Sequence, residues 1–319
     1  MIPLKETNAI LSNAVLKEER GVAGHKYKEV VDEIVKYCQE NIGPRNLISA
    51  FFKNLTGKPE TYKITIPHEI TSKIDFIETL DINITFSEMG SKVVTNSGGG
   101  RIDILKKNLS NFTDDGKLAH AVINLDAFRY HGEVLTRTLT NSLYHELNHG
   151  YDVWSRGVRG VANYVNDINR GYAVKDNAVF SIIPDINQLF QEIFYRLFIP
   201  TEFNALVSGV YGDLRSMNSS RENFKKDIHN TQAGWVLDKF TNNFDNCLPY
   251  TSVDALMEAC KIMGIDDVSR QDPHTFLVTF KLSFEKKIRE AWKRVGRVAS
   301  LWYDDKEESK EINEGLYVI

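Results

Sequence analysis

The feature that most constrains this chain is a pair of histidines spaced by one helical turn. The segment Asn141–Trp154 reads NSLYHELNHGYDVW, in which His145 and His149 begin and end the motif HExxH. On an α-helix, residues four apart share a face, so both imidazoles can bind one tetrahedral Zn²⁺. Glu146 is rotated by about 100° from His145, which directs its carboxylate toward water on the ion rather than toward the ion. The motif therefore predicts a zinc site that carries its own general base.

The residues around the motif predict the kind of helix that such a site needs. One face is apolar and repeats every four residues, at Leu135, Leu139, Leu143, Leu147 and Tyr151. Another face is polar and comprises Thr138, Asn141, Ser142, His145 and His149. A helix of this pattern buries its leucines and can line a cavity with its polar side chains. The alternative interpretation is an ordinary amphipathic helix with two histidines on its surface.

Composition and charge narrow the class of protein. Of 319 residues, 42% are hydrophobic and 26% are charged, as in ordinary globular proteins, and the formal net charge is −4. Because the chain is slightly acidic and has no long cluster of basic residues, we expect no nucleic-acid partner. The N-terminus lacks the apolar core of a signal peptide and no apolar run approaches 18 residues, so we expect no membrane partner and a cytoplasmic location. The three cysteines, Cys38, Cys247 and Cys260, are widely spaced and odd in number, which argues against a disulfide framework. They include no CxxC pair, which argues against a thiolate zinc site.

Strand-like alternation is confined to the part of the chain before the motif. Four segments alternate between apolar and polar residues and predict a small mixed sheet: Thr61–Ile70, Asp81–Glu88, Arg101–Leu105 and His120–Phe128. The glycines Gly98–Gly100 precede the third segment and predict a mobile hairpin, because neither a phosphate-loop motif nor a following helix accompanies them.

Helical spacing dominates the rest of the chain. Further helices are predicted at Lys26–Asn41, Asn46–Leu55, Pro184–Phe198, Thr231–Phe240, Ser252–Met263 and Thr275–Tyr303. Pro200 is expected to break or restart a helix that continues to Leu214. The segment Gly157–Lys175 is rich in Arg, Asn and Gly and predicts an irregular functional loop. The charged tail Asp304–Gly315 is expected to be exposed.

A catalytic zinc site needs a third protein ligand beside the two histidines. In the metzincins this ligand is a histidine six residues after the second one, but here Ser155 stands at that position and Asp152 replaces the intervening glycine. That class is therefore excluded. The next histidine, His229, comes 80 residues after His149, and Glu202 comes before it, early in a predicted helix.

With these elements in order, the chain resembles the zincin metallopeptidases, particularly the gluzincins. In that family a small twisted sheet precedes an HExxH helix, and a later helix supplies a glutamate ligand. The resemblance covers about Thr61–Leu214 and implies an α+β, zincin-like fold. It implies a helical segment over residues 1–60, a catalytic core over 61–215, and a helical region over 216–319 that packs on the core. More loosely, the chain resembles zincin-like proteins encoded by tailed phages.

The resemblance also implies a role for each residue of the site. His145, His149 and Glu202 would be the ligands of Zn²⁺, and Glu146 would be the general base. Glu192, ten residues before Glu202, is the rival third ligand.

One position departs from the family pattern. Many gluzincins have an aspartate four residues after the ligand glutamate, where it orients a zinc histidine, but this chain has Leu206 there. The orienting partner must therefore come from elsewhere, and Asn204 is a candidate.

The function implied is hydrolysis of peptide bonds in a peptide or protein substrate. Peptidases of this kind need a donor for the oxyanion at the scissile carbonyl, and His229, Tyr211 and Tyr172 are the candidates. A strand edge at His120–Phe128 or Arg101–Leu105 could bind the substrate in extended form.

Two other functions stay open. One is a non-catalytic structural protein with a zincin fold, which would be associated with the virion if the chain is encoded by a phage. The other is a zinc hydrolase that acts on a non-peptide amide.

Overall fold

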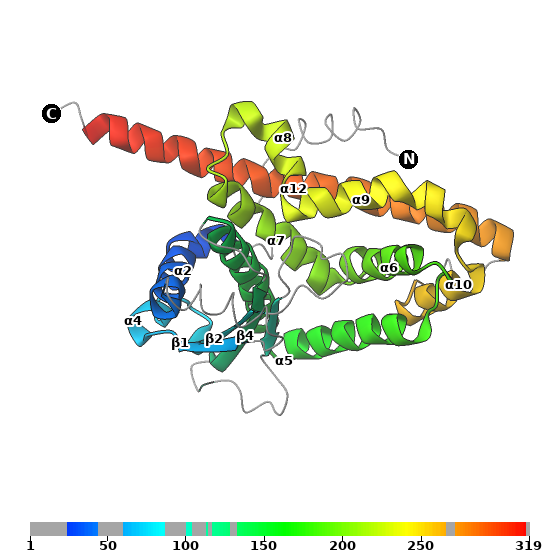
Figure 1. The fold of residues 1–319 in the computed structure, drawn as a ribbon, viewed down its shortest axis with the longest axis horizontal. Coiled ribbons are helices and arrows are strands. Elements are labelled where there is room, and N and C mark those ends of the chain that lie inside the picture. The colour runs from blue at the N-terminus through cyan, green and yellow to red at the C-terminus, as the bar shows by residue number, and fades with distance from the viewer. Residues whose placement is uncertain are drawn as a thin grey trace. The chain divides into compact units, whose positions relative to one another are not determined.

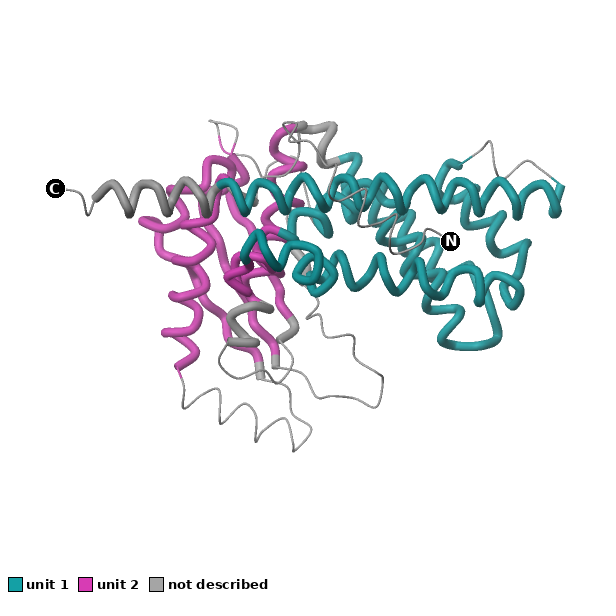
Figure 2. The backbone as a smooth tube through the Cα atoms, turned by 90° about the horizontal axis from the view of Figure 1, so that it is seen from above, with its two compact units in different colours: residues 1–19, 162–210, 220–319 teal, residues 20–161, 211–219 magenta. Residues whose placement is uncertain are grey.

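The computed structural model describes residues 24–43, 60–86, 100–103, 113, 117–127, 133–265 and 272–316 (Figure 1). The chain divides into two compact units, shown in different colours in Figure 2. The described part of unit 1 consists of residues 162–210, 220–265 and 272–316. Unit 2 consists of the described residues up to 161 together with 211–219.

Unit 2 contains a mixed sheet of four described strands. These are β1 (Glu60–Thr65), β2 (Ile77–Phe86), β3 (Gly100–Asp103) and β4 (Leu118–Ala127), and their order in the sheet is β1-β2-β4-β3. β1 pairs antiparallel with β2, β2 pairs parallel with β4, and β3 pairs antiparallel with β4. All four predicted strands are therefore present, and the predicted α+β class is confirmed in a chain that is mostly helical.

Alternation in the two central strands explains why they form. The buried positions recur every second residue, at Leu80, Ile82 and Ile84 in β2 and at Ala121, Ile123 and Leu125 in β4. On the other face, Asn83 donates a hydrogen bond to Asn124 across the parallel pair at 2.9 Å. One face of the sheet thus supplies the core of unit 2.

The first predicted strand is shorter than expected. It was predicted to run to Ile70, but β1 ends at Thr65 and the short helix α4 (His68–Thr71) follows. Pro67 has no N–H for the ladder, so the strand cannot continue through it. The helix α2 (Lys28–Ile42), predicted from its apolar spacing, contacts both β1 and α4.

The helix with the HExxH motif is much longer than predicted. It is α5 (Glu133–Asn177), and the predicted leucine stripe is buried at Leu139, Leu143 and Leu147; the side chains of Leu135 and Thr138 lie outside the described ones. The prediction of an irregular loop at Gly157–Lys175 is wrong, because this segment is helical. Its buried residues do follow a helical period, but they include an aspartate and a glycine: Tyr164, Asp167, Gly171 and Val174.

The described part of unit 1 is helical. Its elements include α6 (Pro184–Ile193), the π-helical segment η3 (Phe194–Phe198), α8 (Phe224–His229), α9 (Gln232–Cys247), α10 (Val253–Ile262) and α12 (Pro273–Leu316). Thr231 and Ser252 cap α9 and α10, where their hydroxyls accept hydrogen bonds from the N–H groups of Gly234 and Ala255. Phe244 of α9 stacks on Phe284 of α12 with ring centroids 3.8 Å apart. These elements confirm the predicted helices of this region.

The helix α7 (Pro200–Ser216) contributes residues to both units. The predicted restart at Pro200 is confirmed. Ile199 is extended, with φ −90° and ψ 112°, because the residue before a proline avoids the helical region. Pro200 then takes the first position of α7, where no N–H is needed.

Several predictions concern residues outside the described ones. They are the helix Asn46–Leu55, the first two glycines of the hairpin predicted at Gly98–Gly100, and the exposure of the tail, whose backbone is helical to Leu316. The predicted boundaries at residues 60 and 215 remain predictions. Within the part of the chain that is described, no helix combines the length and the apolar character needed to cross a membrane.

Candidate metal centre

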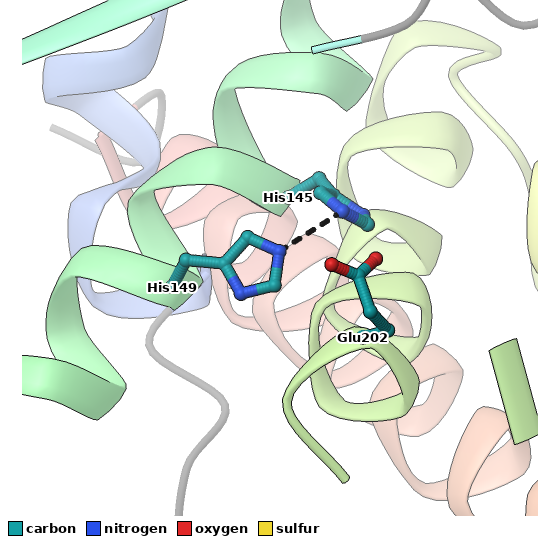
Figure 3. A group of neighbouring side chains, drawn as sticks. All are labelled: His145, His149 and Glu202. Carbon is teal, nitrogen blue, oxygen red and sulfur yellow. Dashed lines mark hydrogen bonds between the residues drawn. The ribbon is translucent and has the colours of Figure 1, made fainter. Parts of the chain in front are cut away.

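The two motif histidines of α5 face each other. Their Nε2 atoms lie 3.2 Å apart and their ring planes are inclined by 80° (Figure 3). His149 is buried and His145 is partly exposed, with 15% of its side chain accessible to solvent. The two nitrogens that converge are the ones that a metal ion between the rings would need.

Glu146 is buried beside the pair but is not among the grouped ligand atoms. Only 2% of its side chain is exposed, and its Oε1 lies 4.0 Å from Nε2 of His145. The helix rotates it away from the line that joins the two histidines, as expected for adjacent positions. Its carboxylate is thus close to the two histidines without belonging to the group of possible ligands.

Glu202 lies in the first turn of α7. Its carboxylate, together with the imidazoles of His145 and His149, forms a group in which the ligand atoms all lie within 4.8 Å of one another (Figure 3). Among the residues that the structure describes, this is the group of His, Cys, Asp and Glu side chains that could share an ion. A position in the first turn also favours an ionised carboxylate, because the positive end of the helix dipole lies there.

The start of α7 is fixed by a buried carboxylate of unit 1. Asp167 of α5 accepts a hydrogen bond from the Thr201 hydroxyl at 3.0 Å and a longer one from the Thr201 N–H at 3.4 Å. It therefore satisfies a donor at a helix end whose N–H groups have no partner within the helix. Glu202 is the next residue, so its backbone position depends on this contact.

The distance between the two imidazole nitrogens is compatible with a shared zinc ion. Two nitrogens that each lie about 2.0–2.1 Å from one tetrahedral Zn²⁺ are separated by about 3.3 Å. The separation of 3.2 Å between the Nε2 atoms agrees with this value. Two imidazoles and a carboxylate are also the donor set of known catalytic zinc sites.

The rival ligand Glu192 has other partners. It accepts a hydrogen bond from Gln188 at 3.1 Å and forms an ion pair with Lys239 at 3.0 Å. It does not belong to the group of possible ligands. Asn204, the candidate for orienting a zinc histidine, accepts a hydrogen bond from Arg294 Nη1 at 2.8 Å.

The three candidate oxyanion donors lie in different environments. His229 pairs with Asp238 at 2.7 Å and packs against Trp292 with ring centroids 5.0 Å apart, which supports a structural role. Tyr211 is buried and its ring meets that of Tyr144 edge to face. Tyr172 is exposed. The role of donor therefore remains a prediction for each of them.

A residue that the sequence did not reveal lies beside Glu202. Tyr195 lies in the π-helical segment η3, near enough to Glu202 for that carboxylate to act on its phenol. The pKa of Tyr195 is raised above its ordinary value, mainly by burial and also by the negative charge of Glu202. No helical period links Tyr195 to Glu202, because a π-turn and the break at Ile199 separate them.

Comparisons with protein-family models, with curated proteins and with solved structures found no match.

Proposed function

We propose that the chain is a zinc-dependent hydrolase of peptide bonds. His145, His149 and Glu202 would hold the ion and Glu146 would act as general base. The observation that carries the proposal is the convergence of the two Nε2 atoms at 3.2 Å, with a carboxylate of a second helix in the same group.

The ion would contribute Lewis acidity, which polarises a carbonyl group and makes water more acidic. The chain would contribute the proton transfer. Glu146 is buried, adjacent to a ligand and outside the ligand group, so its carboxylate can take a proton from the attacking water and deliver it to the leaving amine. A surface helix with two histidines would explain neither the burial of Glu146 nor that of His149.

The first experiment identifies the metal. Two histidines and a carboxylate also suit ferrous iron, so zinc and iron should both be measured in the purified protein. We expect about one zinc per chain in the wild type and well below one in His145→Ala and His149→Ala, because a two-ligand site binds zinc weakly. Full zinc occupancy in both variants would contradict the assignment of these histidines as metal ligands. Iron in place of zinc would contradict the proposed zinc-dependent reaction.

The second experiment separates catalysis from metal binding. Glu146→Gln keeps the shape of the side chain but removes its basicity. We expect unchanged zinc content and a fall in peptidase activity of about 10²–10⁴-fold on a mixed peptide library. Equal activity in wild type and variant would mean that another base or a contaminant acts. Zinc without hydrolysis of any peptide would favour the structural protein or the hydrolase of a non-peptide amide.

A further inference from the structure

We propose that Asp167 and Arg294 are positioning residues for Glu202, the third ligand of the proposed zinc site. Asp167 binds the residue before Glu202, and Arg294 binds the two residues after it. Together these two anchors hold the first turn of α7 in the place from which the Glu202 carboxylate reaches the ion. This inference rests on the proposed function, because it concerns how a ligand of that site is held.

The place of Glu202 in its helix explains why it needs such support. Glu202 is the third residue of α7, and Ile199, just before the helix, is extended. A turn at a helix end lacks hydrogen bonds on one side and frays more readily than an interior turn. His145 and His149 lie well inside α5, where turns on both sides restrain them. The carboxylate is therefore the ligand whose position depends most on contacts from outside its own helix.

Asp167 of α5 anchors the start of the turn. Its Oδ2 accepts hydrogen bonds from the Thr201 hydroxyl at 3.0 Å and from the Thr201 N–H at 3.4 Å, and both residues are buried. The acceptor at a helix start normally comes from the residue that precedes the helix. Here that residue is Ile199, whose side chain has no acceptor. The bond from Asp167 therefore closes the helix end and also fixes where α7 begins relative to this part of α5.

Arg294 of α12 anchors the other end of the turn. Its Nη1 donates a hydrogen bond to Oδ1 of Asn204 at 2.8 Å. Its guanidinium carbon also lies 4.8 Å from the centre of the buried Phe203 ring, and a cation is attracted to the face of an aromatic ring. Because a guanidinium is planar and can donate and stack at the same time, this one arginine holds two consecutive residues.

These contacts enclose the ligand within the sequence of the turn. Of the four residues Thr201–Asn204, three are bound by Asp167 or Arg294 and the fourth is Glu202. The two anchors come from different helices, and all of these residues belong to unit 1. A backbone held on both sides of a ligand limits the positions of its carboxylate, as a metal site of fixed geometry requires. Loss of residues that support a ligand usually weakens metal binding by about 10–100-fold.

The test is the affinity of the full chain for zinc, measured by competition with a chromophoric chelator. Asp167→Ala removes one anchor, and Arg294→Met removes the other while it keeps an unbranched side chain beside Phe203. We expect each to weaken zinc binding by about 10–100-fold. Asp167→Asn should lose much less affinity, because its amide oxygen can still accept a hydrogen bond. An equal loss in Asp167→Asn and Asp167→Ala would contradict the role of the hydrogen bond.

Two threonines give a matched pair of variants. Thr201→Val removes the hydroxyl that binds Asp167, and Thr231→Val removes a buried hydroxyl that caps α9 in the same unit. Both should lower thermal stability, but only Thr201→Val should weaken zinc binding. Equal zinc losses in the pair would mean that affinity follows the general stability of unit 1, and the positioning role would be overturned.

A double-mutant cycle shows whether an anchor acts through Glu202. Glu202→Gln should weaken zinc binding, and adding Asp167→Ala should weaken it little further, because the carboxylate that the anchor positions has already been lost. The visible spectrum of the cobalt-substituted protein reports the geometry of the ligands. It should change in Asp167→Ala and Arg294→Met and stay unchanged in Thr231→Val.

The outcomes separate this inference from the proposed function. If Glu202→Gln weakens zinc binding but Asp167→Ala and Arg294→Met do not, the positioning role is overturned and the proposed function stands. A loss in only one of these two variants would overturn the role of the other residue. Losses of Asp167→Ala and Glu202→Gln that add in full would overturn the action through Glu202. If the wild type binds no zinc, or Glu202→Gln binds it as tightly as the wild type does, the ligand assignment is wrong and both proposals fall.

Discussion

At the residue scale, the part of α5 around the motif buries several polar side chains. Glu146, Asn148, His149 and Asp152 are each no more than 3% exposed. Burial of a polar group costs free energy unless a hydrogen bond or a charge compensates for it. A helix selected only for stability would carry apolar residues there. The polar side of this helix therefore indicates a function that is maintained at some cost in stability.

Asn148 gives a direct measure of that cost. In the part of the chain that is described, neither Oδ1 nor Nδ2 of this buried amide has a hydrogen-bond partner. Asn148→Leu has a similar volume and removes both polar atoms, so the free energy of unfolding should rise by about 1–3 kcal/mol. Urea denaturation of the metal-free protein measures it. Asn204→Leu, which breaks the bond to Arg294, should lower the stability instead. Loss of stability in Asn148→Leu would show that its amide is compensated.

At the element scale, α5 and α7 come into contact at a glycine within unit 2. A Cβ atom on Gly212 would lie 2.4 Å from Cδ2 of Tyr144, which is buried and precedes His145 by one residue. The ring of Tyr144 also meets that of Tyr211 with centroids 5.7 Å apart. This close packing joins the end of α7 to the turn of α5 that carries the first histidine.

Gly212→Ala tests this contact. Alanine in place of glycine within a helix is normally favourable by about 1 kcal/mol. Here the overlap with a buried ring should reverse the sign and destabilise the fold by about 1–3 kcal/mol. Thermal unfolding measures the change. Gly171→Ala is the comparison and should cost less, because its Cβ would lie 2.9 Å from Ile199 Cδ1 and 3.0 Å from the Tyr195 ring, rather than 2.4 Å from a ring. Equal or higher stability in Gly212→Ala would mean that the two helices separate easily.

The elements could be predicted wherever one periodicity continued without interruption. β2, β4 and the turn from His145 to His149 are such cases, since each contains its own complete pattern. The prediction failed at Gly157–Lys175, whose content of Arg, Asn and Gly favoured a loop, although the segment is helical and its Gly171 makes room for a tyrosine ring. Glu202 could be proposed only from the order of elements in a family. Tyr195 could not be proposed, because a π-turn leaves no period in the sequence.

At the scale of the whole molecule, each unit contains one buried thiol. Cys38 lies in unit 2 and Cys260 in unit 1, and burial raises the pKa of each to about 12. Cys247 is only partly buried. Since the thiolate is the reactive form, the two buried thiols can react only when their own unit opens.

Thiol labelling should therefore show one fast and two slow cysteines at pH 8. The fast reaction should disappear in Cys247→Ser. In increasing urea, the slow rates of Cys38 and Cys260 report separately on the opening of unit 2 and unit 1. Mass spectrometry of labelled peptides measures both rates in one sample. Rapid labelling of Cys38 or Cys260 without denaturant would contradict their burial.

The parallel pairing of β2 with β4 has a consequence for the chain during its synthesis. Leu118 follows its partner Ile77 by 41 residues, which the ribosome adds in about 2–8 s at about 5–20 residues per second. Until then β1 can cover one edge of β2. The other edge presents unpaired N–H and C=O groups beside isoleucines that are buried in the folded protein. Such an edge is a template for strands of other chains. Translation is therefore the period in which this sheet is most exposed to pairing with a neighbouring copy, and the arrival of β4 ends it.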